Sequence, residues 1–74
     1  MKSTLAVNAL LTDQGVRKAD LARRMNISAA ALSMKLKQKD LTVGALAEIL
    51  RSLDCKVVIV PSRARLPEGS IELE

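Results

Sequence analysis

The stretch LARRMNISAAALSMKL, which begins at Leu21, constrains the fold more than any other part of the chain. It holds one short apolar face at helical spacing that ends at Met25 and a second that joins Leu32 to Leu36. Because so few residues separate the two faces, a tight turn must connect two short helices. Asn26 lies in that turn, and asparagine tolerates the left-handed backbone conformation better than most residues.

The residues around the turn predict how the two helices are locked together. A helix is expected over residues 18–25, and Ser28 is a good N-cap for the next helix, over residues 29–37. Ala22 is small where the two helices come closest, and we expect Ile27 to fill the angle between them. The three alanines that open the later helix are strong helix formers, and we expect Ala31 to pack inward.

Two further helices are expected, one on each side of this pair. The first is capped by Ser3 or Thr4 and runs to about residue 14, with Gly15 as its left-handed end. The last covers residues 43–53 and is capped by Thr42. In the first helix, one apolar side is predicted at Leu5, Ala9 and Thr12, with Val7, Leu10 and Leu11 nearby. The last helix has a core-facing stripe at Val43, Leu46, Ala47, Leu50 and Leu53.

The pattern changes after Asp54. CKVVIV, residues 55–60, is apolar and rich in β-branched residues and is followed by Pro61, which is typical of a strand. A strand needs a partner, since an open apolar edge promotes aggregation. One candidate partner is SIELE near the C-terminus, which would pair back to form a hairpin. The other is the same strand of a second subunit, paired antiparallel about a two-fold axis. The two pairings are compatible.

The chain therefore divides into a helical domain at residues 1–54 and a strand or short hairpin at residues 55–74. The second part is the expected dimerisation element. Its predicted interface residues are Val57, Val58, Ile59 and Val60.

Composition excludes several classes of function for this small domain of 74 residues. With no histidine and one cysteine, it lacks the residues for His-based acid–base catalysis or a usual zinc cluster. No nucleophile–base pair or phosphate-binding loop is present, so we expect neither an enzyme nor a cofactor. No apolar run is long enough to cross a membrane, and no cleavable signal is evident. We expect a cytoplasmic protein without a membrane partner.

The positive charge is concentrated around the helix pair. Residues 17–39 hold seven basic residues against Asp20 alone, a net +6, whereas the whole chain carries +4. The rest of the chain is therefore net −2. A solvated basic surface is the simple interpretation, but concentration on one helix pair favours a polyanionic partner.

KADLARRMNISAAALSMKL followed by TVGALAEILRSL resembles the Cro/phage-repressor-like helix-turn-helix regulators, the XRE family. The shared pattern has Leu21–Ala22, an apolar residue three positions later, a turn, Ser28 and then Leu32–Ser33. Asn26 replaces the usual turn glycine, and Arg17 replaces a frequent capping Thr or Ser. The resemblance covers residues 3–54 and implies a mainly α, four-helix lambda-repressor-like domain. LDCKVVIVP is similar to a small subset whose last helix runs into a dimerising strand.

The resemblance implies that the third helix enters the major groove of double-stranded DNA. Carried over by position, the base-facing residues are Ser28, Ala29, Ala30, Ser33 and Met34. The residues next to phosphates are Lys18, Arg23, Lys35, Lys37 and Lys39; of Arg23 and Arg24, one is expected to point away from DNA. This direct readout is thin, because it offers two hydroxyls and several methyl groups that can contact thymine methyls. Shape readout or half-site spacing would then supply specificity.

Two functions remain open at this point. One is a sequence-specific transcriptional regulator, a repressor that acts as a homodimer on a pseudo-palindromic operator. The alternative is an antitoxin or protein-interaction module whose C-terminal strand binds a partner protein, with DNA binding serving only autoregulation.

Overall fold

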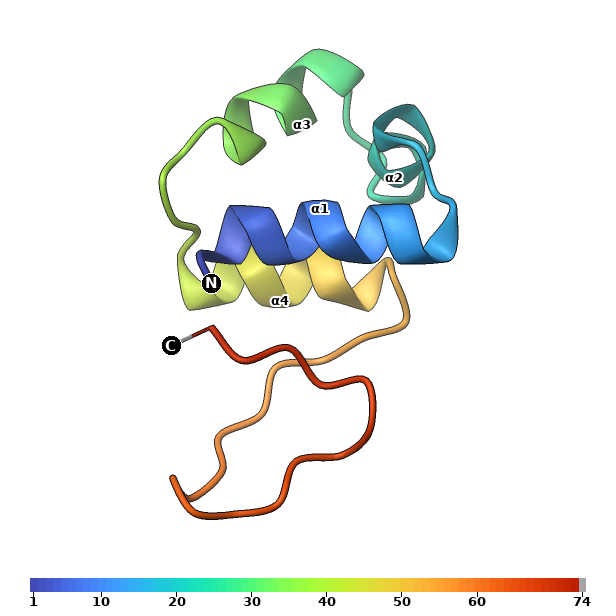
Figure 1. The fold of residues 1–74 in the computed structure, drawn as a ribbon. Coiled ribbons are helices and arrows are strands. Elements are labelled where there is room, and N and C mark those ends of the chain that lie inside the picture. Colours follow the sequence, from blue (N-terminus) through green and yellow to red (C-terminus); the bar gives the residue numbers. More distant parts are fainter. Residues whose placement is uncertain (74) are drawn as a thin grey trace.

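In the computed structural model, which describes residues 1–73, four helices form two layers (Figure 1). The helices are α1 (Ser3–Gln14), α2 (Lys18–Arg24), α3 (Ala29–Leu36) and α4 (Val43–Arg51). α1 and α4 pack alongside each other, and α2 packs on α3 on one side of them. The segment after α4 lies on the other side. All four predicted helices are confirmed, although α2, α3 and α4 end one or two residues before residues 25, 37 and 53.

An aliphatic core holds the two layers together. Its least exposed side chains come from all four helices and from the turn after α4. Burying one such leucine or isoleucine contributes about 1.5–3 kcal/mol of hydrophobic free energy. The buried core residues are Val7, Leu11, Leu21, Ala22, Leu32, Leu46, Ile49, Leu50 and Leu53.

The turn between α2 and α3 has the predicted conformation. Asn26 is left-handed, with a φ of 59°. The backbone N–H of Ile27 donates to the carbonyl of Ala22 at 3.0 Å, which closes the end of α2. Ile27 is half-buried against the core, and Ala22 is buried within it. The predicted left-handed conformation of Asn26 is therefore confirmed, and the burial of Ala22 and Ile27 agrees with the packing roles predicted for them.

Two of the three predicted N-terminal helix caps are confirmed and one is wrong. The Ser28 hydroxyl accepts from the backbone N–H of Ala31 at 3.0 Å, and the Thr42 hydroxyl accepts from that of Ala45 at 3.1 Å. Gly15 ends α1 in the left-handed conformation with a φ of 64°. At the start of α1, however, the capping position is Lys2, whose side chain makes no capping bond. Neither Ser3 nor Thr4 occupies that position, and both are buried.

A carboxylate from a distant part of the chain closes the start of α1 instead. The backbone N–H of Ser3 donates to Oδ1 of Asp40 at 3.0 Å, and the Ser3 hydroxyl donates to the same oxygen. The Ser3 hydroxyl also accepts from the backbone N–H of Leu41 at 2.7 Å. A negative charge at a helix N-terminus is favoured by the helix dipole. These bonds fasten the α3–α4 connection to α1.

The predicted apolar stripes of the outer helices need correction. Leu5 is 57% exposed and Thr12 is exposed, because α1 turns Val7 and Leu11 toward the core. In α4, Val43 is 71% exposed, whereas Ile49, which lay outside the predicted stripe, is fully buried. A helix that contacts neighbours from more than one direction buries a wider face than a single stripe. Ala31 is half-buried, in agreement with its predicted inward position.

The predicted C-terminal strand is not formed within residues 1–73, which contain no strand. Residues 56–60 make no backbone hydrogen bond to any other described residue. The chain returns as irregular structure, and Leu73 packs against the core, so a hairpin with SIELE is not present in the described residues. Its last residue, Glu74, lies outside them. Pairing with a second subunit stays a prediction.

The returning segment encloses a hollow of about 440 Å³ against the outer face of α1 and α4. Ala6 and Leu10 line it from α1, and Leu46 and Leu50 from α4. The amino group of Met1 donates to the carbonyl of Leu73 at 2.7 Å, so the segment's end is held close to the start of the chain.

Replacing Ser3 with alanine should destabilise the fold without unfolding it. We expect a loss of about 1–2 kcal/mol in the free energy of unfolding, chiefly because the partly buried N–H of Leu41 loses its acceptor. Urea unfolding followed by circular dichroism measures this difference. Ser70→Ala is the matched control, because the Ser70 hydroxyl donates only to Pro67 in the exposed segment.

The stability difference between the wild type and Ser3→Ala should also depend on pH. The Ser3 hydroxyl and N–H hold the pKa of Asp40 below its ordinary value. A lowered carboxyl pKa stabilises the fold above the unfolded pKa, about 3.9, and that contribution disappears as pH falls through the folded pKa. The stability difference between the wild type and Ser3→Ala should therefore be constant near neutral pH and narrow below about pH 4. A difference that persisted unchanged at acid pH would contradict the role given to the Asp40 carboxylate.

Candidate nucleic-acid interface

The exposed side of α3 carries all the residues predicted to face bases. Ser28, Ala29, Ala30 and Ser33 are exposed, and Met34 has 70% of its surface accessible. The opposite side of the helix is fixed by Leu32, which is buried against α2. The capping bond of Ser28 fixes the first turn. A rigid helix thus presents a surface made largely of methyl groups, one thioether and two hydroxyls.

Basic side chains follow this surface at its C-terminal end. Lys37 and Lys39 are exposed, and Lys35 is half-buried. The backbone beyond α3 is held in place, because the carbonyl of Lys39 accepts from the Thr4 hydroxyl at 3.4 Å and Asp40 is tied to Ser3. Lysine side chains on a fixed backbone suit contact with phosphates whose spacing is also fixed.

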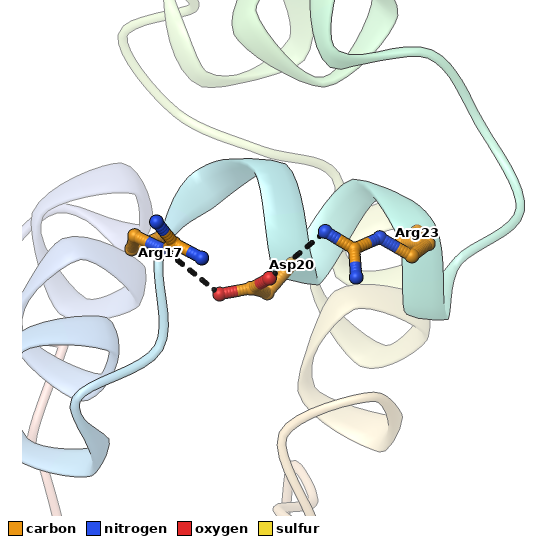
Figure 2. A network of polar contacts seen from close by, with 3 residues as sticks. All are labelled: Arg17, Asp20 and Arg23. Carbon is orange, nitrogen blue, oxygen red and sulfur yellow. Dashed lines mark hydrogen bonds and ion pairs between the residues drawn. The ribbon is translucent and has the colours of Figure 1, made fainter.

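A second basic group lies at α2. Lys18 is its exposed first residue. Arg17 and Arg23 lie on either side of Asp20 (Figure 2): Nε of Arg17 is 3.2 Å from Oδ2 of Asp20, and Nη2 of Arg23 is 3.1 Å from Oδ1. The hydrogen bond from Arg17, its charge and that of Arg23 hold the pKa of Asp20 below its ordinary value. Both arginine side chains are largely exposed, at 83% and 76%.

This network changes the interpretation of Arg23, which the sequence predicted as a phosphate contact. Its guanidinium already has an anionic partner. A phosphate would therefore have to share the guanidinium with Asp20 or displace Asp20 from it. The sequence does contain a signal for this network. Arg17, Asp20 and Arg23 are spaced i, i+3 and i+6, and residues three apart are neighbours on a helix surface. By net charge alone, Asp20 only lowers the positive charge of residues 17–39 by one, and its pairing with the two arginines does not appear.

Arg24 contacts the end of α4 instead of Asp20, and which of the two arginines points away from DNA stays a prediction. Nη1 of Arg24 donates to the carbonyl of Ser52 at 3.1 Å, at the C-terminal end of α4. Nε2 of Gln14 donates to the carbonyl of Leu53 at 2.9 Å. Carbonyls at a helix C-terminus lack partners within the helix, so both side chains serve to fasten α4 to α1 and α2.

The four residues predicted for dimerisation lie apart from α3. They belong to the segment on the far side of the α1–α4 layer (Figure 1). Ile59 is 99% exposed and Val58 59%, whereas Val57 and Val60 are about two-fifths exposed. The structure therefore separates the α3 surface from the apolar segment instead of joining them into one site.

Within residues 1–73, no group of three or more acidic, cysteine or histidine side chains is placed to hold a metal ion. No helix in this part of the chain is long and apolar enough to cross a membrane.

Comparison with known proteins assigns the family. No match was found among curated proteins or among solved structures. A family model for the Cro/C1-type HTH DNA-binding domain matches residues 7–58. The match includes α2, the turn at Asn26, α3 and α4, together with most of α1. It confirms the resemblance drawn from the sequence. The chain belongs to the family of Cro/C1-type helix-turn-helix DNA-binding domains.

Proposed function

We propose that this protein is a cytoplasmic transcriptional repressor, not an enzyme, that binds a pseudo-palindromic operator as a homodimer. The observation that carries the proposal is the exposed face of α3 with lysines beside it, presented by a helix-turn-helix of the Cro/C1 type. In this arrangement α3 enters the major groove, and Ser28, Ala29, Ala30, Ser33 and Met34 meet base edges.

The phosphate contacts come from both ends of the helix pair. Lys18 approaches the backbone from α2, and Lys35, Lys37 and Lys39 approach it beyond the base-reading face. Arg23 joins them by exchanging its bond to Asp20 for one to a phosphate oxygen. Such contacts orient the domain on any duplex and carry no sequence information by themselves.

The homodimer is supported by the free backbone and side chains of residues 56–60. Their N–H and C=O groups make no backbone hydrogen bond within residues 1–73, and their valine and isoleucine side chains are exposed. Two such segments paired antiparallel about a two-fold axis would satisfy these groups and cover the apolar surface.

The same observation favours a second candidate, in which residues 56–60 add a strand to a partner protein and DNA binding serves autoregulation. An antitoxin would act in this way. Strand addition needs only an open backbone edge and alternating pockets on the partner, so the exposed segment fits either occupant.

DNA recognition is tested by titrating a duplex selected from a random pool against a scrambled duplex at increasing salt. We expect the selected duplex to keep an advantage of about 10³ or more, since non-specific binding weakens steeply with salt. Ala30→Gln should alter the selected sequence, because glutamine adds the bidentate adenine contact that α3 lacks. Equal binding to both duplexes at all salt concentrations would rule out the repressor.

Replacing Asp20 with asparagine should strengthen binding to any duplex. The substitution removes a negative charge beside the phosphates and releases Arg23. We expect the plot of log K against log salt to steepen by up to about 0.9, the slope of one added phosphate contact. Glu48→Gln removes an equal charge from an exposed position of α4 and is the matched control. An unchanged slope for Asp20→Asn would place Arg23 away from the DNA.

Dimerisation is tested by Ile59→Lys in the full chain. Ile59 is 99% exposed, so the substitution spares the fold of the single subunit. In an isologous strand pair it would bring two positive charges close together, and we expect at least about ten-fold weaker association in sedimentation, or 1.4 kcal/mol. Ser62→Lys adds the same charge elsewhere in the exposed segment. If both variants sediment like the wild type, the interface lies outside residues 56–60.

A further inference from the structure

The exposed face of α3 has an unusual chemical composition for a surface that meets DNA. Ala29, Ala30, Ser33 and Met34 are spaced i, i+1, i+4 and i+5, which places them on one contiguous side of the helix. All four are exposed, and Met34 is the largest exposed side chain of the group. Apart from the Ser33 hydroxyl, this face offers only carbon and sulfur atoms.

Such a face cannot read bases through paired hydrogen bonds. Bidentate recognition of adenine requires an amide group, and that of guanine requires an arginine or a lysine, and none of the four residues of this face is of these types. The hydroxyl of Ser28 at the helix start already accepts the N–H of Ala31. The two serine hydroxyls can form single hydrogen bonds, which discriminate weakly between bases. Most of the face is left with apolar contact, and the apolar group on a major-groove edge is the methyl at C5 of a pyrimidine.

The shape of the helix favours close apolar contact. Alanine is short, so the backbone of α3 can approach the groove floor at Ala29 and Ala30, while Met34 reaches further along the groove. The lysines beyond the face and Lys18 on α2 supply the attraction to phosphates that holds an uncharged surface in place. The sulfur of methionine is polarisable and its chain adapts to irregular apolar contacts.

We propose that α3 reads the 5-methyl groups of pyrimidines in the major groove. The inference rests on the proposed DNA-binding function and deepens it by naming what the recognition face selects. Two bases carry this group, thymine and 5-methylcytosine, and the same contacts serve both. The selected operators are then rich in thymine where α3 lies, and methylation of cytosine at such a position strengthens binding.

Exchange of single thymines for uracil tests the proposal, because uracil lacks only the 5-methyl group. The full-length protein is titrated against its selected duplex and against a series with one uracil at each thymine position. At contacted positions we expect about four-fold weaker binding per methyl removed, the equivalent of about 0.8 kcal/mol for one buried carbon group. Thymines outside the α3 contacts serve as internal controls.

A double-mutant cycle assigns the contact to α3. Met34→Gln keeps the side-chain length and a similar helix propensity but removes the terminal methyl and sulfur. At the uracil positions that Met34 contacts, the four-fold ratio between thymine and uracil should fall close to one for this variant, because the two changes remove the same contact. Leu5→Gln removes an apolar group that is 57% exposed on α1 and should leave the ratio unchanged.

A third measurement tests whether α3 reads 5-methylcytosine as well as thymine. At each sensitive position, the T·A pair is replaced by C·G and by 5-methylcytosine·G. Stronger binding of the methylated duplex than of the unmethylated one extends the reading to 5-methylcytosine, whereas equal binding of the two limits it to thymine and overturns the wider proposal.

The outcomes also separate this inference from the proposed function. A selected duplex that binds specifically but tolerates uracil at every position overturns methyl reading and leaves the repressor in place. Absence of any preferred duplex overturns both.

Discussion

The packing of α3 on α2 is the interaction on which the rest of the structure depends. Leu21 and Leu32 are completely or almost completely buried in it, and Ala22 is small enough to let the two helices approach. The left-handed Asn26 sets the direction of the chain between them. Without this contact α3, with only eight residues, would not be a stable helix in water. The exposed face of α3 has a defined orientation only because its other face is buried.

Polar contacts between residues far apart in the sequence add to the small hydrophobic core in holding the helices together. Asp40 closes the start of α1 and holds the connection that carries Lys39, while Gln14 and Arg24 bind carbonyls at the end of α4. Each contact satisfies backbone groups that a helix end leaves without partners. A chain of 74 residues without aromatic side chains has a limited hydrophobic core, so such ties matter more here than in a larger domain.

The molecule separates two kinds of surface. The α3 side carries exposed lysines beside an uncharged helix face, which suits a polyanion. On the far side of the α1–α4 layer, residues 57–60 are apolar and have no backbone partners among the described residues, which suits another polypeptide. A partner on one side leaves the other accessible, so protein association and DNA contact can occur together in this fold.

Local chemistry in the sequence determined the four helices, the turn and the face of α3. Ser28, Thr42, Gly15 and Asn26 act through bonds or backbone angles within a few residues, and the Leu21 and Leu32 stripes repeat at helical spacing. These features predicted the family and the candidate interface, since the helix-turn-helix is itself a local motif. The pairing of Arg17 and Arg23 with Asp20 was present in their spacing too, although its effect on Arg23 required the geometry.

Tertiary structure alone decided the features that join distant residues. Asp40 meets Ser3 across 37 positions, which no periodicity encodes, and that contact replaced the predicted cap of α1. The burial of Ile49 and the exposure of Leu5 and Val43 depend on which neighbours surround α1 and α4. Residues 55–60 have strand propensity, but a strand forms only where a second backbone offers hydrogen bonds, and no backbone group within residues 1–73 bonds to residues 56–60.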